Sequence, residues 1–542
     1  MRRVILVFLS LASSCSPPTP DPNVIEQSGP VSIRRELVRV PAPKPPPNPV
    51  TQTPTPDAQD VVTVVRYRVD TGQRPPRPAR AIVVLMPGFM GGAGSFDSLA
   101  RGIVRRSSST DAFEAWAIDR RSNTMEDRTG IEAALAARDA ELLTSYYFAG
   151  ASVGSATFGG FKRQEDVAFE SEWGLASTMN DLRAVISRIP ADQRRAHVVV
   201  AGHSLGSGLA SMYAAWDFDG TPGFSELAGL VLIDGVTGSE GAPLGFTKEE
   251  YEATGLPNSG FGGRPSLKQV REQNRYFAFP LLEAKLFPIG VGTALRSTFR
   301  PDAIERDQPR RDALETLFLT NDLPRMTNRA AFGLAFDAAT CPVSIAAVNA
   351  GQTDGPLVDT TSAFGGTIKK PASSNQTFKW VEFDQTDPKE LTSLTEFALA
   401  WSRPGADFGE WYFPSRLSLD TALGSSLTLG QTEWPAVDYG IRTFHGRSLD
   451  APVLVEAAGI LNGDVAKYDR FKALLPPVGA NRPGAGAART DRDGFEALSH
   501  PSFTHIDPLA GTDVPGGEIA RWFDAIVDFA RRNTTSPGVV VP

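Results

Sequence analysis

The chain has 542 residues, 41% of them hydrophobic, and a formal net charge of −8 at pH 7. A chain of this length can bury a core larger than that of one ordinary domain. The acidic balance, without a basic cluster or a zinc-like spacing of Cys and His residues, argues against nucleic acid as a partner.

The first 15 residues are predicted to be a signal peptide. Arg2 and Arg3 precede a short apolar run, residues 4–12, which is too short for a stable membrane helix. Cys15 follows small residues and resembles the lipobox cysteine of bacterial lipoproteins, which is acylated after cleavage. We therefore expect a lipid-anchored protein of the bacterial cell envelope, with membrane contact through the anchor only. Ordinary secretion is the alternative.

Residues 16–60 are predicted to be a tether. Thirteen of the 43 prolines lie between Pro17 and Pro56, with few apolar residues among them, which is typical of an extended, solvated spacer. If Cys15 is acylated or removed, Cys341 is the one remaining cysteine, so no intrachain disulfide is expected.

Strand and helix patterns alternate in the next part of the chain, which we take as the first part of a folded core at residues 61–236. Strands that alternate with helices imply a parallel sheet with helices on both faces, an α/β fold. The predicted strands are residues 61–69, 81–86 and 113–118, and the predicted helices are residues 131–147 and 173–189.

Two loops follow predicted strands. Pro87-Gly88-Phe89-Met90-Gly91-Gly92-Ala93-Gly94 is glycine-rich, but no Gly-Lys-Ser or Gly-Lys-Thr follows, so a phosphate loop is rejected. Arg120 and Arg121 follow the strand at residues 113–118. They are interpreted either as ligands of a substrate carboxylate or, preferably, as part of a solvated loop.

The most informative segment is Gly202-His203-Ser204-Leu205-Gly206, between a valine-rich strand and a helix of small residues. Glycines let neighbouring chains pass close to a serine held on a sharp turn, and the following helix directs its positive end at that serine. This strand–turn–helix pattern resembles the nucleophile elbow of the α/β-hydrolase superfamily, in its lipase and esterase branch.

The resemblance implies that Ser204 is a nucleophile and that its acid and then its base follow in the chain. His505 is the preferred base, because it lies in a turn-rich loop before the last predicted helix and Thr504-His505-Ile506-Asp507-Pro508 resembles the catalytic histidine loop of these enzymes. His500 is the reserve base. The resemblance also implies that the N–H groups of Phe89 and Leu205 hold the oxyanion, with Met90 as a substitute for Phe89.

The acid is predicted at Asp464, after the strand that begins near residue 452. Glu456, at the end of that strand, is the second candidate. Asp234 is the third, because some lipases carry the acid after the earlier strand at residues 227–233. Asp354 follows a similar strand-like run and is regarded as a decoy. The role of the acid is to hold the imidazole in one tautomer.

More than two hundred residues separate the strand near Asp234 from the strand near Pro452. In the family that the chain resembles, an insertion at this point forms a cap, so residues 237–448 are predicted to be a cap and residues 449–542 the second part of the core. The aromatic segment 408–413 is interpreted as cap-to-core packing or, less strongly, as the lining of an acyl pocket.

The resemblance implies hydrolysis of small-molecule or lipid carboxylic esters through an acyl-enzyme, with neither a metal nor an organic cofactor. A peptidase or an acyltransferase would use the same residues, so both remain alternatives. A non-catalytic surface lipoprotein on the same scaffold is the alternative from another class. The oligomeric state is left open.

Overall fold

The computed structural model describes residues 24–28, 31–72, 75–239, 245–256, 264–277, 283–305, 307–372, 375–381 and 390–541. The predicted signal peptide and Cys15 lie outside the described residues. Among the described residues, no helix combines the length and the apolar character that a membrane crossing requires.

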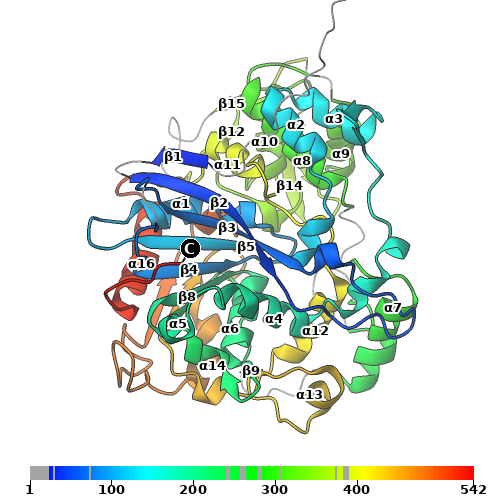
Figure 1. The fold of residues 1–542 in the computed structure, drawn as a ribbon. Helices are drawn as coiled ribbons and strands as arrows, with labels where there is room; N and C mark the ends of the chain where they lie inside the picture. Colours follow the sequence, from blue (N-terminus) through cyan, green and yellow to red (C-terminus); the bar gives the residue numbers. More distant parts are fainter. Residues whose placement is uncertain are drawn as a thin grey trace, which may run out of the picture.

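A central sheet organises the fold (Figure 1). Its six parallel strands form one side of the described sheet, and three strands extend it antiparallel at the other. In spatial order the strands are β1 (Val24–Ser28), β2 (Val31–Pro41), β3 (Val61–Val69), β5 (Phe113–Asp119), β4 (Ala81–Met86), β8 (Val198–His203), β11 (Gly229–Ile233), β16 (Val453–Ala457) and β17 (Phe495–Ser499).

The inner parallel strands are apolar on both faces. Every residue of β4, β8, β11 and β16 is buried, which is typical of a sheet covered by helices on both sides. Along β4, alternate residues enter different cores: Ile82 and Val84 face one, Val83 and Leu85 the other. The first core includes α4 (Leu175–Ile186) and α6 (Leu205–Ala215), and the second includes α1 (Asp97–Arg105) and α16 (Glu518–Asn533). The predicted α/β fold is confirmed.

The predicted tether is wrong for residues 24–28, which pair with β2, and for residues 31–60. β2 pairs with β3 over nine residues. Most residues from 42 to 60 are exposed, but the segment is held on the folded domain at buried positions such as Thr55, whose Oγ1 accepts from Nε1 of Trp173 at 3.0 Å. Asn48 is fully buried and its Nδ2 donates to the carbonyls of Ala168 (3.0 Å) and Arg271 (3.2 Å). Pro41 ends β2, and the ten residues before it in that strand contain no proline, so the density of prolines around them did not imply a solvated backbone there.

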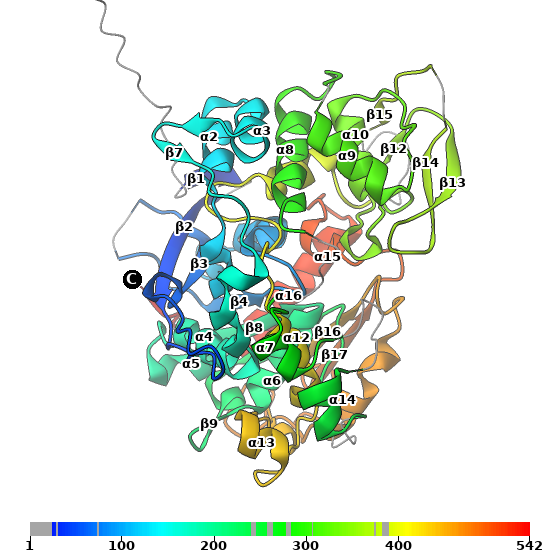
Figure 2. The ribbon, with the colours of Figure 1, turned by 90° about the vertical axis from the view of Figure 1, so that its right-hand side faces the viewer.

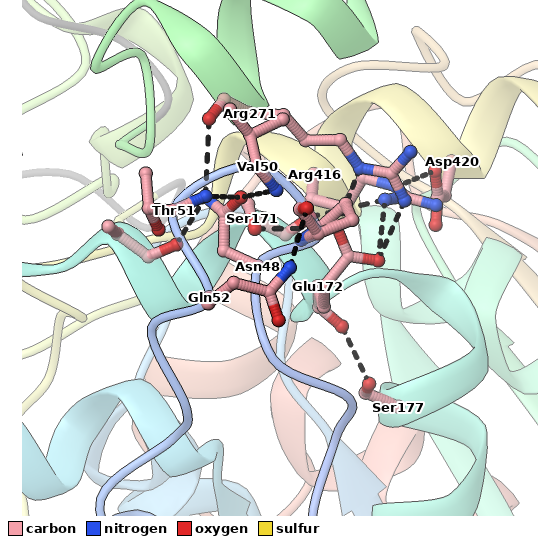
Figure 3. A network of polar contacts seen from close by, with 12 residues as sticks. Asn48, Val50, Thr51, Gln52, Ser171, Glu172, Ser177, Arg271, Arg416 and Asp420 are labelled. Atoms are coloured by element: carbon pink, nitrogen blue, oxygen red, sulfur yellow. Dashed lines mark hydrogen bonds and ion pairs between the residues drawn. The ribbon is translucent and has the colours of Figure 1, made fainter.

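This N-terminal segment joins a larger polar network (Figure 3). Glu172 accepts hydrogen bonds from Arg271 at 2.7 and 2.9 Å and from Arg416 at 3.3 Å. Arg416 also donates to Asp420 at 2.7 Å. Because these residues come from four distant parts of the chain, the network ties residues 48–52 to both the core and the insertion.

The cap is built from two segments rather than one. The upper lobe in Figures 1 and 2 contains helices from the excursion after β5 beside helices of the long insertion. The excursion supplies α2 (Thr129–Ala137) and α3 (Ala140–Phe148), which replace the single helix predicted at residues 131–147 because Arg138 is left-handed, with φ 53°. The insertion supplies α8 (Leu286–Phe299), α9 (Gln308–Leu317), α10 (Asn328–Phe336) and α11 (Leu394–Trp401).

Other parts of the predicted cap belong to the core. Residues of α7 (Leu267–Glu272) and α12 (Ser415–Gly424) pack into the same apolar cluster as α4 and α6. α13 (Trp434–Tyr439) lies at the lower end of the molecule, away from the upper lobe (Figure 2). The segment predicted as the cap, residues 237–448, therefore contains both cap and core structure.

The upper lobe also carries short strands, β12 (Gln352–Thr353) to β15 (Trp380–Val381).

Candidate active site

Ser204 lies on the sharp turn between β8 and α6. Its backbone has φ 57° and ψ −123°, a strained conformation for a residue with a side chain, and its N–H donates to the carbonyl of Ile233 at 2.9 Å. Glycines allow the turn: a Cβ added at Gly202 would lie 1.9 Å from the carbonyl oxygen of Gly206, and one at Gly206 would lie 2.1 Å from that of Met86. The turn therefore presents Ser204 at the carboxyl edge of the sheet.

His505 is paired with Asp234. The two side chains meet with Nδ1 of His505 2.7 Å from Oδ2 of Asp234, and the side chains are 6% and 0% exposed. The ring of His505 lies beside that of His203, with 4.3 Å between centroids. The Nε2–H of His203 donates to the carbonyl of His505 at 2.8 Å. The histidine–carboxylate pair is therefore attached to the residue that precedes Ser204.

The carboxylate of Asp234 is held by backbone donors as well. It accepts from the N–H groups of Ala458 (2.9 Å), Ile460 (2.9 Å) and Leu461 (3.2 Å), which belong to the turn after β16. Burial raises the pKa of Asp234, but the hydrogen bond and charge of His505 and these N–H groups outweigh it, so the pKa lies below its ordinary value. Asp234 therefore remains a carboxylate at neutral pH.

The preference for Asp464 as the partner of His505 is wrong. Asp464 caps the short helix Val465–Tyr468, where its Oδ1 accepts from the N–H of Ala466 at 3.0 Å, and its side chain is 47% exposed. The turn after β16 directs its backbone N–H groups at Asp234, whereas the carboxylate of Asp464, which follows in the same turn region, points to the N–H of Ala466. Asp354, the decoy, accepts from the N–H of Lys379 at 2.7 Å in the cap.

Glu456 and His500 form a separate pair. Oε1 of Glu456 lies 3.2 Å from Nδ1 of His500, and the ring of His500 stacks on Phe503 with centroids 4.5 Å apart. Burial and the neighbouring charge of Asp234 raise the pKa of Glu456 well above its ordinary value, which favours a protonated carboxyl. Sequence reasoning named both residues as reserves, and the structure pairs them with each other rather than with Asp234 or His505.

Asp507 holds the loop that carries His505, a function that sequence reasoning missed. Its buried carboxylate accepts from the backbone N–H of Thr504 (2.8 Å), from the side chain of Asn349 (2.8 Å) and from the hydroxyl of Thr392 (2.7 Å). Asn349 and Thr392 belong to the cap insertion. The loop of His505 is thus attached directly to the cap. The sequence shows an aspartate two residues after the histidine, but no sequence pattern distinguishes an aspartate that holds this loop from one that caps a helix.

The glycine-rich loop after β4 passes beside Ser204. A Cβ added at Gly88 would lie 2.8 Å from the Cβ of Ser204. On its other side the loop pairs with the aromatic segment: the N–H of Gly92 donates to the carbonyl of Phe408 at 2.9 Å, and a Cβ on Gly92 would lie 2.4 Å from the carbonyl oxygen of Asp407. The glycines are required by this close approach of two backbones.

Arg120 holds the same loop through hydrogen bonds to its backbone carbonyls. Its guanidinium donates to the carbonyls of Pro87 (2.5 Å) and Gly88 (2.9 Å) and is paired with the fully buried Glu410 at 2.6 Å. Arg121 is buried too and is paired with Asp181 at 2.5 Å. Both interpretations of the two arginines, a carboxylate ligand and a solvated loop, are therefore wrong. Both side chains are buried, and each is paired with a carboxylate of the protein, so they stabilise loops.

The aromatic segment 408–413 packs between cap and core, as its preferred interpretation predicts, and its part in an acyl pocket stays a prediction. Phe408 stacks on Trp401 of α11, with centroids 4.7 Å apart, and lines a cavity in the cap. Phe413 packs on Phe89 at 4.7 Å and belongs to the core on one face of the sheet.

Within the described part of the chain, no group of three or more His, Cys, Asp or Glu residues is arranged to hold a metal ion.

No protein-family model and no curated protein matches the chain. Among solved structures, it is similar to a "putative lipase" from Sulfolobus solfataricus, at 12% identity and a TM-score of 0.41, over 92% of this chain and 94% of the other. It is similar to a peroxisomal alpha-beta-hydrolase from Saccharomyces cerevisiae at 10% identity and a TM-score of 0.36, over 94% and 92%. An epoxide hydrolase from Vigna radiata has 11% identity and a TM-score of 0.34, over 91% and 97%.

The strand order and the turn at Ser204 define the fold independently of these similarities. A mostly parallel sheet with helices on both faces, and a sharp strand-to-helix turn at the end of β8, constitute the α/β-hydrolase fold.

Proposed function

We propose that this protein is a serine hydrolase that cleaves carboxylic esters through an acyl-enzyme on Ser204. The observation that carries the proposal is the buried contact of His505 with Asp234, at 2.7 Å, beside the strained turn at Ser204. A nucleophile, a buried carboxylate and a histidine in this order along the chain form the catalytic triad of the fold.

In the first half of the reaction, His505 Nε2 takes the proton of Ser204 Oγ as that oxygen attacks the ester carbonyl carbon. The carbonyl oxygen becomes an oxyanion, for which we propose the N–H groups of Leu205 and Phe89 as donors, with Met90 as the neighbour of Phe89. The tetrahedral intermediate collapses, the bond to the alcohol oxygen breaks, and His505 gives its proton to that oxygen.

In the second half, water replaces the alcohol. His505 takes a proton from water, the resulting hydroxide attacks the acyl carbon, and the proton returns to Ser204 as the carboxylic acid leaves. Asp234 keeps Nδ1 protonated throughout, so Nε2 is the nitrogen that exchanges protons, and its negative charge stabilises the imidazolium. The three backbone N–H groups on Asp234 support this role because they favour its charged form.

The experiment is labelling with a small fluorophosphonate together with turnover of p-nitrophenyl esters and p-nitroanilides. Parent protein should be labelled at Ser204 and should hydrolyse the esters, and Ser204→Ala should lose both properties. Residual turnover in Ser204→Ala within tenfold of the parent would refute the nucleophile. Anilide turnover comparable to ester turnover would make the protein a peptidase on the same residues.

We also propose that the protein is attached to the bacterial cell envelope through an acylated Cys15, as the first residues predict. The residues beyond Cys15 do not provide the long spacer expected from the sequence, because the first described strand of the sheet, β1, begins at Val24. An anchored protein would therefore hold its domain close to the membrane surface.

A further inference from the structure

A cavity of about 200 Å³ lies in the cap beside the proposed catalytic residues. Its wall includes Phe89 and Met90 of the glycine-rich loop and Ile506, the residue after His505. From there it extends between α8, α9 and α10, helices of the upper lobe (Figure 2). One end of the cavity therefore adjoins the proposed oxyanion donor and base, and the other lies inside the cap.

The lining is apolar. Aromatic and aliphatic side chains form it, with Thr293, Arg310 and Cys341 as the exceptions among the described lining residues. The guanidinium of Arg310 is engaged with Asn328 Oδ1 at 3.0 Å and with the carbonyl of Glu305 at 2.9 Å. The thiol of Cys341 lies 3.2 Å from the carbonyl of Val343. The hydroxyl of Thr293 donates to the carbonyl of Ile289 at 2.8 Å, so these three polar groups have partners in the protein. The indole Nε1 of Trp401, which also lines the cavity, is buried and has no partner within the described residues. With this single donor left over, the cavity suits a mainly apolar ligand.

The dimensions limit that ligand. Phe287 and Thr293 both line the cavity. Phe287 lies at the end near the glycine-rich loop and the aromatic segment, since a Cβ added at Gly409 would lie 2.3 Å from its ring. Phe287 and Thr293 are six positions apart on the helix, which is roughly 9 Å along α8. A dry apolar cavity of about 150 Å³ accommodates benzene. By proportion, 200 Å³ accommodates about eight non-hydrogen atoms.

We propose that this cavity is the acyl subsite and that it selects medium-length acyl groups, of six to eight carbons, or a single aromatic ring. The inference rests on the proposed function, because it assumes that the acyl carbon is held at Ser204. An acyl group that enters past Phe89 and Ile506 would place its chain between α8 and α9 and displace no polar partner.

The test is a series of p-nitrophenyl esters from acetate to dodecanoate, together with benzoate, on the full chain. Each methylene buried should raise kcat/KM about fourfold. We expect an increase on the order of 100-fold from acetate to hexanoate, a maximum at hexanoate or octanoate, and a decline at dodecanoate. Equal kcat/KM across the series, or a maximum at acetate, would overturn the subsite.

Variants of α9 identify the cavity as the cause. Ala313 lines it, so Ala313→Phe should lower kcat/KM for octanoate at least tenfold and leave acetate within threefold of the parent. Thr316→Phe puts the same ring on the exposed side of the same helix and should change neither. Leu317→Ala should shift the maximum to longer chains. If Ala313→Phe fails to fold, an unshifted maximum in Leu317→Ala overturns the subsite.

A binding measurement separates failure of this inference from failure of the proposed function. Ser204→Ala should bind octanamide in titration calorimetry, and Ser204→Ala combined with Ala313→Phe should bind it at least tenfold more weakly. Fluorophosphonate labelling of the parent without octanamide binding by Ser204→Ala overturns the subsite alone. Octanamide binding without labelling or ester turnover overturns the proposed function and, with it, the acyl role of the cavity.

Discussion

Asp234→Asn is the substitution that most directly tests the proposed triad. Oδ1 of Asp234 accepts from the N–H groups of Ala458 and Leu461, and Oδ2 accepts from that of Ile460 and faces Nδ1 of His505. The NH2 of an asparagine would therefore meet N–H donors in either orientation. If it replaces Oδ2, His505 must turn Nδ1 into an acceptor and carry its proton on Nε2.

That tautomer cannot take the proton of Ser204, so kcat should fall by roughly 10²- to 10⁴-fold. The unpaired donors at the buried amide should cost about 1–3 kcal/mol of stability, which leaves a folded protein to assay. The assay is steady-state hydrolysis of p-nitrophenyl hexanoate, with thermal unfolding measured on the same samples. Asp464→Asn is the matched control, because it makes the same chemical change at an exposed helix cap.

The pH dependence of stability gives a second readout. The folded-state pKa of Asp234 is depressed, so its contribution to stability is present above the unfolded pKa, about 3.9, and is lost as pH falls through the lower folded pKa. Asp234→Asn should therefore lose less stability than the parent in this acidic range. A folded Asp234→Asn with kcat within tenfold of the parent, beside an Asp464→Asn that is crippled, would refute the reasoning.

Three further results are expected. His505→Ala should lose activity as severely as a loss of the nucleophile, since the members of a triad act as a unit, whereas His500→Ala should keep kcat within about tenfold; equal losses in both would contradict the assignment of the base. Arg120→Lys retains the charge beside Glu410 but loses the guanidinium hydrogen bonds to the carbonyls of the glycine-rich loop. We therefore expect kcat to fall roughly tenfold while unfolding in urea stays cooperative. An unchanged kcat would show that the loop does not need this support. Mass spectrometry of the protein made in a bacterial host should find an acylated Cys15 at the mature N-terminus, and a soluble, unacylated chain that begins beyond it would indicate ordinary secretion.

The fold could be predicted from local signals in the sequence. Strands such as residues 81–86 and 198–203 are apolar at every position, as parallel strands covered on both faces must be, and the glycines around Ser204 are required by contacts of less than 2.5 Å to a hypothetical Cβ. The candidate base also followed from order along the chain, because His505 lies in the loop between β17 and the short helix α15 (Asp507–Ala510), ahead of α16. These features depend on neighbours in sequence or on one recurrent turn.

The partner of His505 could only be decided by the tertiary structure. Asp234, Glu456 and Asp464 all lie after or at the end of apolar strands, and the sequence contains nothing that ranks their distances to a histidine. Asp234 is 271 residues from His505, and the turn after β16 brings it three N–H donors. Glu456 is instead paired with His500, and the side chain of Asp464 is about half exposed.

The same distinction applies to the ends of the chain and the cap. Proline density is a property of composition, whereas the pairing of β2 with β3 depends on an edge strand that is free to accept it. The cap joins α3 to α8 although more than a hundred residues separate them. Local periodicity determines which residues form a strand or a helix, but packing between distant segments decides which of them share a core, because burial and hydrogen bonding depend on neighbours in space.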